Sequence, residues 1–258
     1  MLHFTVQKGP ETSKTPPIVI LHGLFGSSDN WKVVATHLSK LSDCYCIDLR
    51  NHGDSPHFPT HTYNDQAQDL KKTIEKVTTK KIILIGHSMG GKTAIQFTHN
   101  YPNIVDKLII LDIAPKKYPR QHDDIFEAMN SIPLKDLISR MDAFPLLEKK
   151  LKNTPLSQFL VKNIKRKVDQ LEWKFNLSIL EKDYSKISEK PLLTNKINQG
   201  TLILYGNKSD YIHPKKDIDL LNSTFNKFKL KEIQNAGHWL HAEQPKTVIS
   251  EIEQFIQR

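Results

Sequence analysis

One stretch near the middle of the chain constrains the fold more than any other. It begins with four apolar residues, Ile82-Ile83-Leu84-Ile85, a run that is typical of a buried parallel strand. Gly86-His87-Ser88-Met89-Gly90 follows and matches the pattern G-x-S-x-G, and residues 93–101 then have the apolar spacing of a helix. A serine between a strand and a helix occupies a sharp turn, where glycine on either side avoids collisions with both elements. The sequence therefore predicts that Ser88 presents its hydroxyl above the N-terminus of a helix.

The length of 258 residues suits one large domain or one domain with an insertion. No segment approaches the roughly 18 consecutive apolar residues that a membrane-spanning helix requires, so we expect no membrane span. The N-terminus lacks the basic start, apolar centre and cleavage site of a signal peptide, and a cytoplasmic location is the default expectation. We expect the two cysteines, Cys44 and Cys46, to be buried, unpaired and without a metal.

The net charge of +9 raises the question of an anionic partner. The lysines are spread along the whole chain, with the sharpest run at residues 162–167, and no nucleic-acid-binding motif accompanies them. We therefore expect no nucleic-acid partner. A phosphate-bearing small molecule would suit the same charge.

Strands alternate with helices along most of the chain, which predicts a largely parallel sheet with helices on both faces. Besides the central strand we expect an edge strand at residues 2–7, buried strands at 18–21 and 108–111, and further strands at 44–47, 201–205 and 228–233.

The alternation breaks between residues 116 and 196, where no strand-like run occurs and several segments have helical spacing. We interpret residues 116–196 as a helical cap inserted into a core formed by residues 1–115 and 197–258. Some of the large apolar side chains of the cap are expected to line a pocket for an acyl or alcohol group, and about half of them to pack the cap onto the core. The candidates are Phe126, Met129, Phe144, Phe159 and Trp173.

Three kinds of side chain that cooperate in nucleophilic catalysis follow strands in the order serine, aspartate, histidine. Ser88 comes first, Asp112 and Asp210 are the candidate acids, and His238 lies near the end of the chain. A histidine can take the proton of the serine hydroxyl while an aspartate fixes the histidine tautomer. The carboxyl ends of parallel strands gather at one edge of the sheet, so either acid could reach His238.

An attacked carbonyl develops negative charge on its oxygen, and backbone N–H groups must stabilise it. We expect these donors to be the N–H of Met89, directly after the serine, and the N–H of Leu24, in the glycine-containing loop that follows residues 18–21. His22, His87 and His241 are expected to have structural or pocket-lining roles.

At these residues the chain resembles the α/β-hydrolase superfamily over nearly its full length. The resemblance implies a mostly parallel, eight-stranded sheet with helices on both faces and an inserted helical cap. A closer resemblance is to the small bacterial YbfF-type esterases, which act on simple esters and acyl-CoA. The stretches that carry it are His22-Gly23-Leu24-Phe25-Gly26-Ser27, Gly90-Gly91-Lys92, Asp112-Ile113-Ala114-Pro115 and Gly237-His238-Trp239-Leu240-His241-Ala242-Glu243.

Most members of the superfamily carry the acid three residues after the glycine of the penultimate strand, a position that is Ser209 here. The resemblance therefore implies that the acid is Asp112, one strand earlier, with Ser209 near the histidine and Asp210 as the alternative acid. It further implies a carboxylesterase or thioesterase that forms an acyl-enzyme on Ser88 and uses no metal or cofactor. The expected partner is a small acyl ester or acyl-CoA, and the expected state is a monomer or weak homodimer.

Two other functions fit the same fold. A lyase of the menaquinone-pathway type would use the three residues to abstract a proton, and would need a basic pocket for several carboxylates. Arginine is scarce in residues 116–196, which weakens this alternative. A non-catalytic ligand receptor would not require the complete set of Ser88, His238 and an acid.

Overall fold

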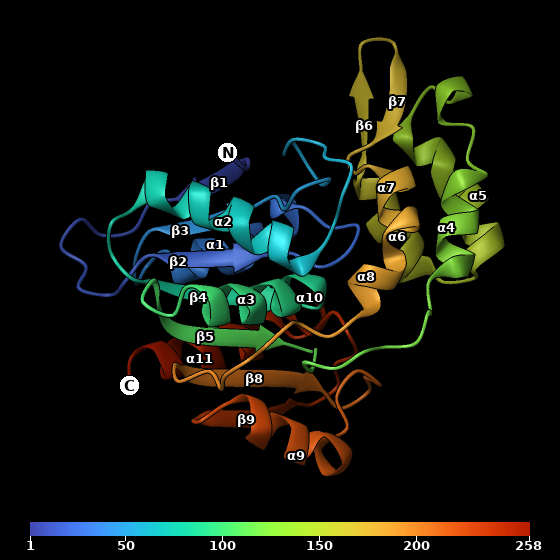
Figure 1. Ribbon diagram of the computed structural model, residues 1–258. Coiled ribbons are helices and arrows are strands. Elements are labelled where there is room, and N and C mark those ends of the chain that lie inside the picture. The colour runs from blue at the N-terminus through green and yellow to red at the C-terminus, as the bar shows by residue number, and fades with distance from the viewer.

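A single seven-stranded sheet organises the computed structural model, which describes residues 1–258. Its order is β1-β3-β2-β4-β5-β8-β9, and all neighbours are parallel except β1 and β3, which pair antiparallel at one edge (Figure 1). The strands that the sequence predicts are all present. Their bounds are β1 Phe4–Gln7, β2 Ile18–Leu21, β3 Cys44–Ile47, β4 Ile82–His87, β5 Val105–Leu111, β8 Gly200–Gly206 and β9 Phe228–Ile233.

The sheet has seven strands rather than the expected eight. The segment between β1 and β2, where a further strand could form, contains Pro10, Pro16 and Pro17. Proline cannot donate to a ladder of backbone hydrogen bonds, so this segment runs as a loop.

Helices cover both faces of the sheet because alternate residues of the buried strands point to opposite sides. On one face α2 (Tyr63–Val77), α3 (Met89–Asn100) and α9 (Pro214–Thr224) join a core of 44 buried residues. On the other face α1 (Lys32–Leu38) and α11 (Pro245–Ile256) join a core of 21. Cys44 and Cys46 both lie in the second core as free thiols, which confirms that they are buried and unpaired.

A separate group of elements comes between β5 and β8 in the sequence. In space it covers the carboxyl ends of the parallel strands (Figure 1). The division into a core of residues 1–115 and 197–258 and a cap of residues 116–196 stays a prediction. The elements are α4 Asp123–Asn130, η2 Leu134–Asp136, η3 Arg140–Asp142, α5 Ala143–Leu151, α6 Thr154–Lys162, β6 Ile164–Lys167, β7 Gln170–Trp173, α7 Leu177–Lys182 and α8 Tyr184–Ser188.

The expectation of a cap without strands is wrong, because β6 and β7 form an antiparallel hairpin. The hairpin is rich in charged side chains, and only Ile164 and Leu171 in it are buried. A short ribbon exposed on both faces needs few apolar residues, so the sequence contains little of the pattern by which strands are recognised.

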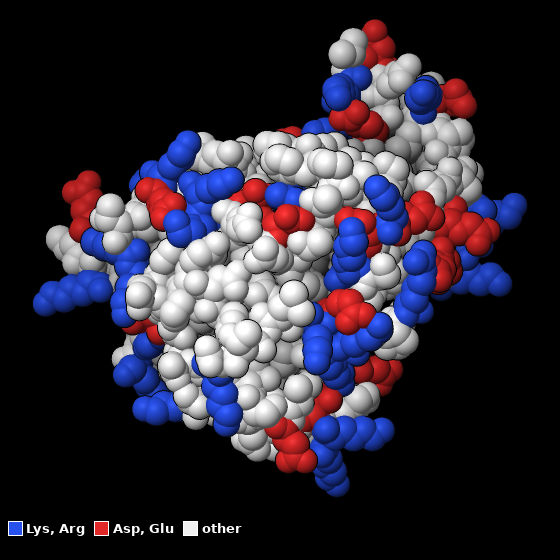
Figure 2. Space-filling view, in the orientation of Figure 1, with Lys and Arg blue, Asp and Glu red and all other residues white.

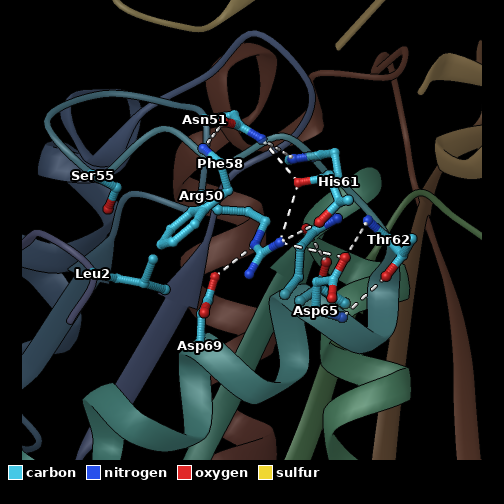
Figure 3. A network of polar contacts seen from close by, with 12 residues as sticks. Leu2, Arg50, Asn51, Ser55, Phe58, His61, Thr62, Asp65 and Asp69 are labelled. Carbon is cyan, nitrogen blue, oxygen red and sulfur yellow. Dashed lines mark hydrogen bonds and ion pairs between the residues drawn. The ribbon is translucent and has the colours of Figure 1, made fainter. Parts of the chain in front are cut away.

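Ion pairs and hydrogen bonds of the Arg50 side chain hold the loop after β3 in place (Figure 3). The Nε atom of Arg50 donates to Asp69 Oδ2 at 2.6 Å, and Nη1 donates to the backbone oxygen of Thr60 at 3.2 Å. Asp48 accepts from the backbone N–H groups of Ser28 at 2.6 Å and Asp54 at 3.0 Å. Asp48 and Arg50 thus hold this loop, and Asp48 also ties it to η1 (Ser28–Trp31).

Charge is dispersed over the surface. On the face in Figure 2, Lys and Arg side chains are interspersed with Asp and Glu instead of forming one continuous basic patch. No helix combines the length and the apolar character that crossing a membrane requires.

Candidate active site

Ser88 lies at the turn between β4 and α3 with a φ of 52°, a conformation that residues with a side chain rarely adopt. The neighbouring glycines make this turn possible. A Cβ atom at Gly86 would lie 2.3 Å from the carbonyl oxygen of Gly90, and one at Gly90 would lie 2.4 Å from that of His22. Both distances are far below van der Waals contact, so only glycine fits at either position.

His238 connects Ser88 to Asp112 by two hydrogen bonds. Its Nε2 atom lies 2.9 Å from Ser88 Oγ and its Nδ1 atom 2.7 Å from Asp112 Oδ2. Backbone bonds hold the partners in place, because Ser88 N donates to the last residue of β5 at 3.1 Å and Asp112 N donates to Leu204 at 2.8 Å. Since Nδ1 donates to a carboxylate, Nε2 is free to accept the serine proton.

Asp112, and not Asp210, is the acid in contact with the histidine. Its side chain is fully buried, and it accepts hydrogen bonds from the Ser209 hydroxyl and from the Gly206 N–H at 3.1 Å. Asp210 is exposed and makes no side-chain hydrogen bond to His238. Ser209, which occupies the position where most of the superfamily has its acid, thus supports Asp112.

Burial shifts the titration of both groups. It lowers the pKa of His238 to about 3, so the ring is neutral at neutral pH, as a general base must be. Burial raises the pKa of Asp112 more than the hydrogen bonds from Ser209 and Gly206 lower it, and the net pKa is about 7. Together with the histidine N–H, three donors converge on this carboxyl and stabilise its ionised form.

The N–H groups of Leu24 and Met89 donate to no protein acceptor. Met89 opens α3, where the helix dipole is positive, and Leu24 lies in the loop after β2. His22 Nδ1 donates to the carbonyl of Gly23 at 2.8 Å, and this carbonyl belongs to the same peptide plane as the Leu24 N–H. This bond fixes the direction of the Leu24 N–H and confirms that His22 is bonded to the loop backbone.

A cavity of about 190 Å³ opens at Ser88 and His238. Ile125, Leu156 and Phe159 of the cap contribute to its wall. Of the five large cap residues that the sequence singled out, only Phe159 is among the lining residues of this cavity. The expectation that about half of them would line the pocket is therefore too high. Phe126, for example, packs on Phe25 instead, with 5.2 Å between the ring centroids.

The sequence analysis assigned no role to two further residues of the site. The ring of Tyr211 stacks on His238, with centroids 3.7 Å apart and an angle of 14° between the planes. Lys92 is buried beside a second, smaller cavity of about 40 Å³, where its ammonium donates to the carbonyls of Ser188 at 3.0 Å and Glu189 at 2.7 Å. Burial lowers the pKa of Lys92 to about 7. Lys92 belongs to the Gly90-Gly91-Lys92 stretch of the family resemblance, but its partners Ser188 and Glu189 lie near the C-terminal end of the cap.

Metal-ligating side chains gather at one place, where atoms of His3, Asp48 and Asp54 lie within 4.8 Å of one another. This cluster shares no residue with the cavity at Ser88. His3 Nδ1 already bonds Asp48 Oδ2 at 2.8 Å, which gives the cluster a structural role at the edge of the sheet.

The parallel sheet, the tight turn at Ser88 and the hydrogen-bonded Ser88–His238–Asp112 array define an α/β hydrolase. The chain belongs to the alpha/beta hydrolase fold family, which it matches over residues 16–245. The resemblance and the fold class inferred from the sequence are both confirmed.

The relatives narrow this class to enzymes of the esterase and lipase type. The chain is 36% identical to the Esterase YbfF of Escherichia coli (strain K12), over 99% of this chain and 98% of that protein. It is 32% identical to the sn-1-specific diacylglycerol lipase ABHD11 of Mus musculus, over 93% of this chain and 81% of that protein. Among solved structures, a marine microorganism esterase matches with a TM-score of 0.93 and 40% identity, over 98% of both chains.

Proposed function

We propose that the protein is a serine hydrolase that cleaves carboxylic esters through an acyl-enzyme on Ser88. The observation that carries this proposal is the 2.9 Å contact between Ser88 Oγ and His238 Nε2, with Nδ1 of the same ring 2.7 Å from Asp112. His238 takes the proton of Ser88 as its oxygen attacks the acyl carbon, and then gives that proton to the leaving alcohol or thiol. Water repeats the sequence and releases the acid.

The oxyanion of each tetrahedral intermediate lies within reach of the free N–H groups of Leu24 and Met89 in this proposal. Each such donor typically stabilises the transition state by about 3–4 kcal/mol. Asp112 keeps His238 in the productive tautomer and stabilises the imidazolium. Ser209 holds the carboxylate of Asp112, and Asp210 takes no part.

For the acyl donor we propose simple esters and, as a finer hypothesis, acyl-CoA thioesters. The apolar cap residues on the wall of the larger cavity suit an acyl chain or an apolar alcohol. The net charge of +9 suits the phosphates of coenzyme A. An acyl-chain series on both nitrophenyl esters and CoA thioesters tests this. Turnover of uncharged esters with no turnover of any CoA thioester would remove the thioester hypothesis.

The lyase alternative is less well supported by the cavity. No lysine or arginine is among its lining residues, and the buried ammonium of Lys92 near the smaller cavity is bonded to two backbone carbonyls. A substrate with several carboxylates would therefore lack charged partners.

Covalent labelling by a fluorophosphonate and a burst of nitrophenol from a nitrophenyl ester test the acyl-enzyme. We expect both in the wild-type protein and neither in Ser88→Ala. If the Ser88→Ala variant hydrolysed esters at the wild-type rate, the proposal would be refuted.

A further inference from the structure

One part of the lining of the larger cavity takes no part in the proposed mechanism. We call this part the inner chamber. It is lined by Asn30 and Trp31 of η1, by His87 at the end of β4 and by His241 of α10 (Leu240–Glu243). All four residues belong to the core, whereas Leu156 and Phe159 of the same cavity wall come from the cap.

Polar atoms of the inner chamber lack partners within the protein. His241 is only 8% exposed, and neither of its ring nitrogens makes a hydrogen bond within the protein. Its Nδ1 atom is sealed from solvent, so Nε2 is the nitrogen that can meet a ligand in the cavity. His87 uses Nε2 to donate to the carbonyl of His238 at 2.8 Å, which leaves Nδ1 as an unused acceptor. The Nδ2 atom of Asn30 and the indole N–H of Trp31 make no protein hydrogen bond either. Unpaired polar atoms that line a cavity normally bind ordered water or a ligand, so the chamber calls for a ligand that both donates and accepts.

The chamber carries no net charge. Burial lowers the pKa of His87 and of His241 well below the ordinary value, so both rings are neutral at neutral pH. His241 stacks on Trp31, with ring centroids 4.3 Å apart, which fixes its plane. A neutral set of donors and acceptors suits water or a hydroxyl group and disfavours a carboxylate or phosphate.

The chamber is part of the same cavity as Ser88 and His238. The His87 ring lies 4.7 Å from that of His238 and 4.6 Å from that of His241, so the three imidazoles form a continuous row that leads to the catalytic base. One water requires about 10–15 Å³, and a cavity of about 190 Å³ therefore holds several waters beside an acyl group.

We propose that the inner chamber binds water and supplies the molecule that hydrolyses the acyl-enzyme, an inference that rests on the acyl-enzyme proposed above. The oxygen of that water attacks the acyl carbon while His238 Nε2 takes one of its protons. The bond between the acyl carbon and Ser88 Oγ then breaks, the proton passes from His238 to Ser88, and the carboxylic acid leaves. The chamber residues belong to the core and the apolar wall to the cap, so we expect an acyl chain bound along the cap wall to leave the chamber free for water.

Partitioning of the acyl group between water and 1-butanol tests the proposal. Both nucleophiles attack the same acyl-enzyme, so the ratio of butyl ester to free acid reports their relative rates whichever step limits turnover. The ratio comes only from molecules that turn over, so partial unfolding of a variant does not alter it. The apolar chain of butanol suits the cap end of the cavity.

We expect His241→Phe, which keeps the stacking on Trp31, to raise the ratio of butyl ester to acid about tenfold, the effect of losing a hydrogen bond to water in the chamber. His241→Gln, which retains a polar group near Nε2, should keep the wild-type ratio, as should the control His37→Phe on the exposed side of α1. A wild-type ratio in His241→Phe would overturn the chamber's role. A wild-type protein that forms no butyl ester and shows no burst would overturn the acyl-enzyme and the chamber with it.

Discussion

Asp112→Asn changes one atom of a side chain that accepts from three donors, and the geometry determines where the new amide must point. The Oδ1 atom of Asp112 accepts from the backbone N–H of Gly206 at 3.1 Å, so an amide NH₂ at that position would oppose another donor. The amide oxygen therefore stays on Gly206, and the NH₂ group faces His238 and Ser209.

An NH₂ group facing His238 donates to Nδ1 and forces the proton of the ring onto Nε2. In that tautomer Nε2 cannot accept the proton of Ser88, although it lies at the same 2.9 Å distance. The equivalent change in other serine hydrolases lowers kcat by about 10⁴, which corresponds to about 5.5 kcal/mol of lost transition-state stabilisation. We expect a loss of this order here with little change in KM.

Steady-state hydrolysis of a nitrophenyl ester measures the effect, with Asp210→Asn as the matched control. The exposed side chain of Asp210 does not touch His238, so its amide variant should keep wild-type kcat. Thermal unfolding of both variants shows that the fold is intact. If Asp210→Asn lost more activity than Asp112→Asn, the assignment of the acid would be wrong.

Three further changes test other parts of the account. Gly90→Ala places a Cβ atom 2.4 Å from the carbonyl oxygen of His22. The variant should lose hydrolysis and have a lower free energy of unfolding, measured by chemical denaturation, and wild-type stability would contradict the steric argument. Burial lowers the pKa of His52 and of His87 well below that of the unfolded chain, so the unfolded state gains protons first as the pH falls. The free energy of unfolding should therefore decrease as the pH falls from about 7.5 to about 5.5. Below about pH 6.5 each histidine should contribute a decrease of up to about 1.4 kcal/mol per pH unit. Denaturation curves that do not change with pH would exclude this contribution of the two histidines. Lys92→Met leaves the carbonyls of Ser188 and Glu189, at the C-terminal end of α8, without their donor. It should lower the free energy of unfolding by about 1–3 kcal/mol in denaturation experiments, and no loss would show that the ammonium does not stabilise the cap.

The sequence specified those parts of the fold that depend on periodicity. The apolar runs placed every strand of the sheet, and the glycines around Ser88 placed the tight turn, because both signals are local. The hairpin of the cap has no such signal: it is a charged ribbon in which Ile164 and Leu171 alone are buried. The strand count failed where Pro16 and Pro17 keep the chain before β2 out of the sheet.

Residue spacing alone could not choose between Asp112 and Asp210, because both follow neighbouring strands. The family resemblance favoured Asp112, and the hydrogen bond to His238 supports it. Contacts between distant segments had no signature at all: Tyr211 stacks on His238, and the carbonyl of Ser188 meets Lys92 across 96 residues. Such pairs are determined by how segments that are distant in the sequence pack together, which no local pattern encodes.

The measurement that tests the central claim most directly is mass spectrometry of the protein quenched in acid during turnover of a nitrophenyl ester. We expect a mass increase of one acyl group on the peptide that contains Ser88, and no such increase in Ser88→Ala. An acyl group found on another residue, or hydrolysis that continues unchanged in Ser88→Ala, would contradict the account.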